Sequence, residues 1–225
     1  MPRERFEQEL RRLAGRVLEL GGLAEAALRD SVSALERQDI VKARALIEAD
    51  HRINVMRYEL ENEAIMIIAT QQPVAGDLRA LAAVFEIATE LERIADYAKG
   101  IATITLSIGT QPSLEPPADL ARMAEVACSM LHRALEAYVH GDARAARAIP
   151  EEDNHVDELY EEIYRQLVGH LLVDPKSIDQ ALRMTWAAHN LERVADRVGN
   201  ICERVVFWVT GSVEEMTDDS GPQRS

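Results

Sequence analysis

Acidic side chains four residues apart occur twice in nearly the same local sequence, and paired carboxylates of this kind can bind a cation. The stretch LERIAD places Glu92 and Asp96 at i and i+4, and LERVAD repeats the pair as Glu192 and Asp196, at a constant offset of 100 residues. Residues at this spacing share one helix face, where two like charges disfavour the helix by about 0.2–0.5 kcal/mol. We therefore expect a compensating interaction at each pair.

Further oxygen-bearing side chains occur at the same spacing on the helix that precedes each motif. Asp50 stands four residues before Asn54, and Asp153 stands four residues before Asp157. Adjacent antiparallel helices that each present two oxygen ligands predict a four-ligand cluster suited to hard or borderline cations. The candidate metal ligands are Asp50, Asn54, Glu92, Asp96, Asp153, Asp157, Glu192, Asp196 and Asn200.

A purely structural interpretation of the same acids is an alternative. Arg93 and Arg193 can reach Asp96 and Asp196 at i+3, which makes each motif a possible solvated salt-bridge patch worth less than about 1 kcal/mol. His189, one turn before Glu192, is interpreted as a satisfied or exposed histidine rather than a ligand.

The elements that must position these acids are helices, because apolar residues recur at intervals of three and four along almost the whole chain. Gly21-Gly22 predicts a kink or a close helix contact inside the first helix, and Asp39, Asp77 and Ser177 are interpreted as N-caps. Gly141-Asp142 predicts a junction between two helices. The expected helices span about 6–37, 40–72, 77–109, 118–140, 142–173 with Pro150 near the first turns, and 177–210.

An internal duplication explains this order of elements. Asp39 and Asp50 recur as Asp142 and Asp153 at an offset of 103 residues. The sequence predicts an all-α fold of two tandem three-helix bundles, six helices in all, related by internal duplication. We expect a first bundle over 1–110, a Pro-rich linker over 111–120, a second bundle over 118–211 and a disordered acidic tail over 212–225.

Composition narrows the function classes. The formal net charge of -14 repels phosphate backbones and anionic lipid, so we expect no nucleic-acid binding. The N-terminus lacks the apolar region of a signal peptide, and no run of about 18 uncharged apolar residues is present, so we expect a cytoplasmic protein without direct membrane insertion. Cys128 and Cys202 are interpreted as buried, reduced thiols, with a disulfide between them as the alternative.

The residues described above resemble the PhoU family. The likeness is carried by QQPVAGDLRALAAVFEIATELERIADYAKGIA, by NLERVADRVGNICERV and by the tandem three-helix units, and it extends from about Phe6 to Thr210. The resemblance implies a non-catalytic cytoplasmic regulator that represses the phosphate-starvation response by linking the phosphate ABC transporter ATPase to a sensor histidine kinase. It also implies multinuclear iron or zinc clusters, or other divalent cations, on the acidic motifs, and we expect a homodimer.

The chain departs from the family pattern at two positions. Asn54 stands where an acid is expected, and Gly100 stands where Asn is common, as in Asn200. The first cluster is therefore expected to be weaker or differently occupied, because an amide oxygen replaces a charged ligand.

Two other function classes remain as alternatives. A ferritin-like di-metal carboxylate oxidase needs two Glu-x-x-His motifs on facing helices. Only EDNH, from Glu152 to His155, matches that pattern, and it lies beside Pro150 at a helix start. The remaining alternative is a helical scaffold without metal.

Overall fold

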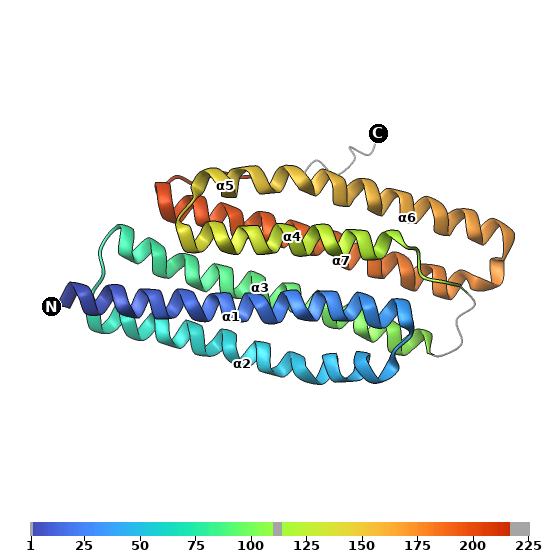
Figure 1. Ribbon diagram of the computed structural model, residues 1–225, viewed down its shortest axis with the longest axis horizontal. Helices are drawn as coiled ribbons and strands as arrows, with labels where there is room; N and C mark the ends of the chain where they lie inside the picture. Colours follow the sequence, from blue (N-terminus) through green and yellow to red (C-terminus); the bar gives the residue numbers. More distant parts are fainter. Residues whose placement is uncertain (1, 110–113, 217–225) are drawn as a thin grey trace.

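The computed structural model describes residues 2–109 and 114–216, and the described residues are helices joined by short turns (Figure 1). The α-helices are α1 (Pro2–Arg37), α2 (Ile40–Gln71), α3 (Gly76–Ile108), α4 (Asp119–His140), α5 (Ala143–Ala148), α6 (Asp153–Val173) and α7 (Ile178–Thr210). Two 3₁₀ turns, η1 (Ile149–Glu152) and η2 (Pro175–Ser177), precede α6 and α7. The predicted all-α class is confirmed.

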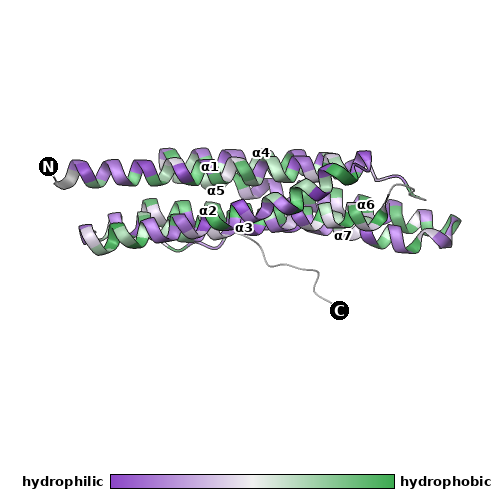
Figure 2. Ribbon diagram, turned by 90° about the horizontal axis from the view of Figure 1, so that it is seen from below, coloured by the Kyte–Doolittle hydropathy of each residue, from purple (hydrophilic) through white to green (hydrophobic). Residues whose placement is uncertain are grey.

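The helices form two three-helix bundles that lie side by side with their long axes nearly parallel (Figure 1). The first bundle holds α1, α2 and α3, and the second holds α4, α6 and α7 with the short α5. Helix α3 packs along α7, and α1 packs on α4, so that the buried side chains of both bundles join in one continuous core. Hydrophilic and hydrophobic residues alternate along each helix, as amphipathic helices require (Figure 2).

Several helix ends follow directly from the sequence. The Asp39 carboxylate accepts a hydrogen bond from the Lys42 backbone N–H at 2.9 Å and caps α2. Gly141 ends α4 in the left-handed conformation at φ 61°, and the Asp142 carboxylate then accepts from the N–H groups of Arg144 and Ala145. These two caps confirm the predicted boundaries.

Other predicted helix starts were wrong in detail. Ala75 occupies the N-cap position of α3 at φ 43°, and Asp77 lies inside the first turn. Ser177 occupies the N-cap position of α7, as predicted, but its hydroxyl donates to the Asp174 carbonyl oxygen at 2.8 Å and makes no capping hydrogen bond to the helix. The predicted fifth helix is divided into α5, η1 and α6, because Pro150 cannot donate the backbone hydrogen bond that a continuous α-helix would need.

The glycine pair in α1 makes a close helix contact and leaves the helix unbroken. A Cβ placed on Gly21 would lie 2.3 Å from Leu135 Cδ1 of α4, so the missing side chain lets α1 and α4 approach. Apart from the adjoining residues and backbone of α1 itself, no described atom lies within 4 Å of a Cβ placed on Gly22. Gly21 therefore makes room for the Leu135 side chain where α1 meets α4.

Both cysteines are buried free thiols, as predicted. Burial raises the pKa of Cys128 to about 11 and that of Cys202 to about 12, which keeps both thiols protonated at neutral pH. Across the described helices, none combines the length and apolar character that crossing a membrane demands.

The chain after α7 differs from the predicted disordered tail over its first residues. The Met216 backbone N–H donates to Glu203 Oε1 at 2.7 Å, and the Met216 side chain packs against the core. The rest of the predicted tail, residues 217–225, lies outside the described residues, as do linker residues 111–113. The described part of the linker also makes contacts, since the Leu114 N–H donates to the Gln180 side-chain oxygen.

Candidate functional site

The first acidic cluster lies between α2 and α3. Asp50 is buried, and its Oδ2 atom accepts a hydrogen bond from Asn54 Nδ2 at 3.0 Å. The same oxygen forms an ion pair with Lys99 Nζ at 2.7 Å. Lys99 Nζ also lies 3.5 Å from Asp96 Oδ1. The other carboxylate oxygen of Asp50, Oδ1, has no hydrogen-bond partner among the described residues. A lysine ammonium thus joins the carboxylates of the two helices.

The electrostatics of this cluster balance repulsion with nearby cations. Burial raises the pKa of Glu92, the negative charges of Asp96 and Asp50 add to that rise, and the positive charge of Arg57 opposes it. The hydrogen bond to Asp50 raises the pKa of Lys99, so the ammonium stays charged. The first cluster therefore contains its own counter-charge.

The second acidic cluster lies between α6 and α7. Asp153 and Asp157 come from α6, and Glu192 and Asp196 come from α7. Within residues 2–109 and 114–216, neither Asp153 Oδ1 nor Glu192 Oε2 finds a hydrogen-bond partner, although both atoms are buried. Arg193 pairs with Asp196 at 2.8 Å, as predicted. Buried oxygens without donors favour a cation that the protein itself does not supply.

The pKa shifts in this cluster show strong mutual repulsion. Burial raises the pKa of Asp153 to about 6, and the charges of Asp157 and Asp196 contribute to the rise. Burial together with the Asp196 charge raises the pKa of Glu192 to about 7, partly offset by Arg193. The pKa of Asp157 is also raised, by burial and by neighbouring carboxylates. A cation placed among these groups would relieve the repulsion.

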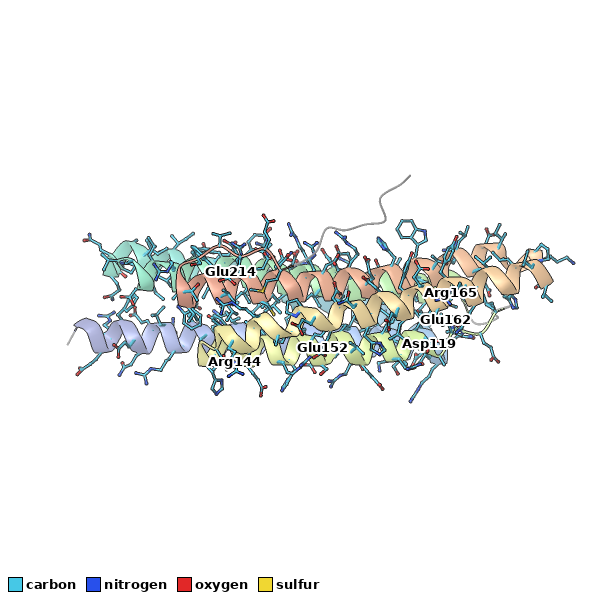
Figure 3. All side chains as sticks on the ribbon, turned by 90° about the horizontal axis from the view of Figure 1, so that it is seen from above. Asp119, Arg144, Glu152, Glu162, Arg165 and Glu214 are labelled. Carbon is cyan, nitrogen blue, oxygen red and sulfur yellow. The ribbon has the colours of Figure 1, made fainter. Side chains whose placement is uncertain are left out.

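A cavity of about 480 Å³ opens beside this cluster, lined by Asp153, Asp157 and Gly199 and by the segment that follows α7. Glu214 of that segment forms a two-pronged ion pair with Arg147, at 2.7 and 2.8 Å. Figure 3 labels Glu214 beside the C-terminal end of α7. The segment after α7 therefore forms one wall of the cavity.

Asn200 and His189 do not lie among the four acids of the second cluster. Asn200 lies apart from them, and His189 lies at their edge. Asn200 Nδ2 lies 3.4 Å from Glu90 Oε2 on α3, so its side chain faces the contact between α3 and α7. His189 Nδ1 lies 3.2 Å from Glu192 Oε2, in an orientation that makes no hydrogen bond with that buried oxygen in the described structure. Burial and Arg193 lower the pKa of His189. The prediction of Asn200 as a ligand gains no support from this placement.

Sequence reasoning missed the cations around the first cluster. Lys99 stands at i+3 from Asp96, a spacing from which its contact with that acid could have been predicted. Arg93, which was expected to reach Asp96, pairs instead with Glu90 at 3.0 Å. Glu90 is buried where α3 meets α7, and Arg197 lies 3.5 Å from it across that contact. Lys99 and Gly199 occupy matching positions of the two repeats. This difference in the sequence could have indicated that the first cluster has a cation that the second lacks.

The side chains as they stand form no finished metal site in the part of the chain that the structure describes. No three His, Cys, Asp or Glu side chains there are grouped so as to hold a metal ion. Among the described residues, buried carboxylate oxygens without a hydrogen-bond partner occur at Asp50 Oδ1 in the first cluster and at Asp153 Oδ1 and Glu192 Oε2 in the second, so the second cluster has two such donor atoms where the first has one. Binding of a cation to the second cluster would require its carboxylates to rotate toward one another.

Comparison with known proteins places both bundles in one family. The PhoU domain model matches residues 17–105 and 120–205. The phosphate-specific transport system accessory protein PhoU of Edwardsiella tarda is 35% identical over 206 residues, covering 92% of this chain and 85% of that protein. The protein of the same name from Escherichia coli K12 is 34% identical, covering 92% and 86%.

Solved structures agree with the sequence comparison. The crystal structure of the phosphate transport system regulatory protein PhoU from Streptococcus pneumoniae aligns with a TM-score of 0.86 at 30% identity, covering 93% of this chain and 99% of that one. PhoU from Pseudomonas aeruginosa aligns with a TM-score of 0.86 at 32% identity, covering 92% and 100%. Since both repeats match and the overall fold agrees, this chain belongs to the PhoU family.

Proposed function

We propose that this chain is a non-catalytic accessory regulator of phosphate uptake. The observation that carries the proposal is the match of both repeats to a family whose relatives are named accessory or regulatory proteins of phosphate transport. In the finer form of the proposal, the chain acts in the cytoplasm. It represses the phosphate-starvation response by linking the ATPase of the phosphate ABC transporter to a sensor histidine kinase.

An exposed apolar surface on the second bundle supports action through a protein partner. Tyr164, Val168 and Leu172 follow i, i+4, i+8 spacing on α6, and Ile178, Leu182 and Trp186 follow the same spacing on α7; all six are at least 40% exposed. We call these six side chains the α6–α7 apolar face. Isolated exposed apolar residues are ordinary, but a group of this kind marks an interaction site.

The two stripes lie on helices that pack together. Helices α6 and α7 run antiparallel and are joined by η2, which places Leu172 and Ile178 at the turn. At the other end, the His189 ring lies 5.8 Å from the Trp186 ring and 6.5 Å from the Tyr160 ring of α6. The two ends of the α7 stripe therefore lie close to α6.

We assign this face to a protein of the transport or kinase system that has an apolar surface with a basic rim. Charge favours such a partner over a second copy of this chain, because two molecules of net charge -14 repel each other. The homodimer expected from the resemblance is thus the competing occupant.

A phosphatase reporter in phosphate-rich medium tests the function, in a strain that lacks this gene. Wild type is expected to restore repression. The double variant Leu182→Ala, Trp186→Glu gives α7 the residues that α3 has at the same repeat positions, Ala82 and Glu86. This variant is expected to lose repression and to lose crosslinking to the ATPase or kinase.

Val41→Ser is the matched control, since Val41 is also highly exposed but lies on α2. Light scattering of the purified variants separates the two occupants: a dimer of wild type that the double variant abolishes would assign the face to a second copy. Failure of wild type to restore repression would refute the proposed function itself.

We also propose that divalent metal, iron or zinc in the first instance, binds the second cluster. Asp153, Asp157, Glu192 and Asp196 would hold it, and the partnerless oxygens and raised pKa values of Asp153 and Glu192 support that assignment. The bound cation would neutralise the carboxylates and fix α6 against α7, next to the apolar face. Metal analysis of protein purified without chelator tests this part.

A further inference from the structure

We propose that the Lys99 ammonium takes the place of a metal ion in the first acidic cluster, so that the chain binds metal through its second cluster alone. The assignment of metal to the second cluster rests on the proposed function above. The assignment of Lys99 rests on contacts within the first bundle.

Lys99 makes the connections that a cation between these helices would make. Its Nζ atom lies 2.7 Å from Asp50 Oδ2 of α2 and 3.5 Å from Asp96 Oδ1 of α3. The Asp50 side chain is only 7% exposed, and it borders a small cavity of about 180 Å³ whose lining is mainly apolar. A charge buried this deeply needs a counter-charge, and the lysine supplies one.

The amide at Asn54 completes the replacement. Asn54 Nδ2 donates to the same Asp50 oxygen that accepts from Lys99. A cation that approached this oxygen would meet an ammonium and an amide N–H group, both of which repel positive charge. Metal binding would first have to break an ion pair that joins α2 to α3.

At the matching repeat positions, the second cluster has neither the lysine nor the amide of the first. Asp157 stands where the first repeat has Asn54, and Gly199 stands where it has Lys99. Gly199 and Asp157 both line the cavity of about 480 Å³. The positions of the amide and the lysine in the first cluster are thus occupied in the second by an acid and by a glycine that lines the cavity.

The charges follow the same division. The first cluster combines three acids, Asp50, Glu92 and Asp96, with Lys99, while Arg57 and Arg93 act on Glu92 from nearby. The second cluster combines four acids with one arginine, Arg193, and with His189, whose pKa is lowered by burial and which lies 3.2 Å from Glu192. The second cluster therefore has the larger unbalanced negative charge, which attracts a divalent cation.

Reciprocal exchange of the repeat positions tests the inference. Chelator-treated protein is titrated with Zn²⁺ in equilibrium dialysis, and bound metal per chain is measured by elemental analysis together with the Zn²⁺-induced shift in melting temperature. The double variant Asn54→Asp, Lys99→Ala rewrites the first cluster after the second, and it is expected to bind about twice as much Zn²⁺ as wild type.

The second exchange is expected to act in the opposite direction. Gly199→Lys places an ammonium beside the second cluster and is expected to abolish Zn²⁺ binding, whereas Gly199→Ala keeps it and controls for packing. Lys42→Ala is the matched lysine control, because Lys42 pairs with Asp30 outside both clusters, and it is expected to bind as wild type does.

The outcomes separate this inference from the proposed metal function. If Asp153→Asn, Asp157→Asn leaves about half of the wild-type Zn²⁺ bound, the first cluster takes metal beside Lys99 and the inference is wrong. If wild type binds no Zn²⁺ but the Asn54→Asp, Lys99→Ala variant does, the metal function fails while the role of Lys99 stands. If the Asn54→Asp, Lys99→Ala variant retains the wild-type helical content but binds no more Zn²⁺ than wild type, Lys99 does not exclude metal from the first cluster and the inference is wrong.

Discussion

Glu192 offers a direct test of the electrostatics of the second cluster, through the substitution Glu192→Gln in metal-free protein. The carboxyl ionises near pH 7 in the folded chain instead of near 4.5, because it is buried beside Asp196, Asp157 and Asp153. A folded-state pKa above the unfolded value gives stability that is complete below pH 4.5 and is lost as pH rises to about 7. Above that range the wild type holds an uncompensated charge that the glutamine variant lacks.

The expected magnitude follows from the size of the shift. Each pKa unit corresponds to about 1.4 kcal/mol, and about 1.5 units of the Glu192 shift fall between pH 5.5 and pH 8. Because the side chain is still 24% exposed, solvent screening reduces this to about 1 kcal/mol. Between pH 5.5 and pH 8, the free energy of unfolding of Glu192→Gln should therefore rise relative to that of wild type by about 1 kcal/mol. This corresponds to about 2–4 °C in melting temperature for a chain of this length.

Thermal unfolding in the presence of chelator at pH 5.5 and pH 8 measures the effect, and both values avoid the isoelectric point near 4.9. Glu19→Gln on the exposed face of α1 controls for the general loss of one negative charge. Equal differences between variant and wild type at the two pH values would refute the argument that burial and repulsion raise this pKa.

Three further predictions concern packing and contacts. Arg147→Ala should release the segment that follows α7, which limited proteolysis would detect as faster cleavage after residue 210; unchanged cleavage would show that the ion pair does not hold the segment. Gly21→Leu should lower the free energy of unfolding by about 1–3 kcal/mol, because the added side chain meets α4, whereas Gly22→Ala should leave it unchanged or raise it by up to about 1 kcal/mol. In urea unfolding, Glu90→Ala should cost about 1–3 kcal/mol, since it leaves Arg197 without its partner across the bundles; a cost near zero would contradict that role.

Local signals in the sequence were sufficient for most of the helices and for the i, i+4 pairing of the acids. The caps at Asp39 and Asp142 act on the nearest backbone N–H groups, and i, i+4 spacing fixes which side chains share a face, so both could be predicted. The contact of α3 with α7 could not, because the periodicity of one helix identifies its buried face without identifying the partner that covers it. For the same reason the burial of Glu90 was missed.

The candidate site was predicted in part. The repeat offsets brought Asp153, Asp157, Glu192 and Asp196 to the same two helices, as the structure does. Whether an acid meets a lysine or another acid depends on side chains from both helices. The sequence identifies Lys99 only as a charged residue on its helix. It becomes the counter-charge of Asp50 because α2 and α3 pack together.

The contact between α3 and α7 also limits how the two repeats can change at the level of the gene. At matching positions the helices carry complementary residues: Gly100 leaves the space that the Asn190 side chain occupies, whereas Asn200 reaches Glu90. Copying the second repeat over the first would place Asn at position 100, where its Cβ would lie 2.9 Å from Asn190 Nδ2. Recombination between the two repeat-coding segments would therefore produce a chain whose halves fit each other less well, and this geometry opposes the homogenisation of the duplicated sequence.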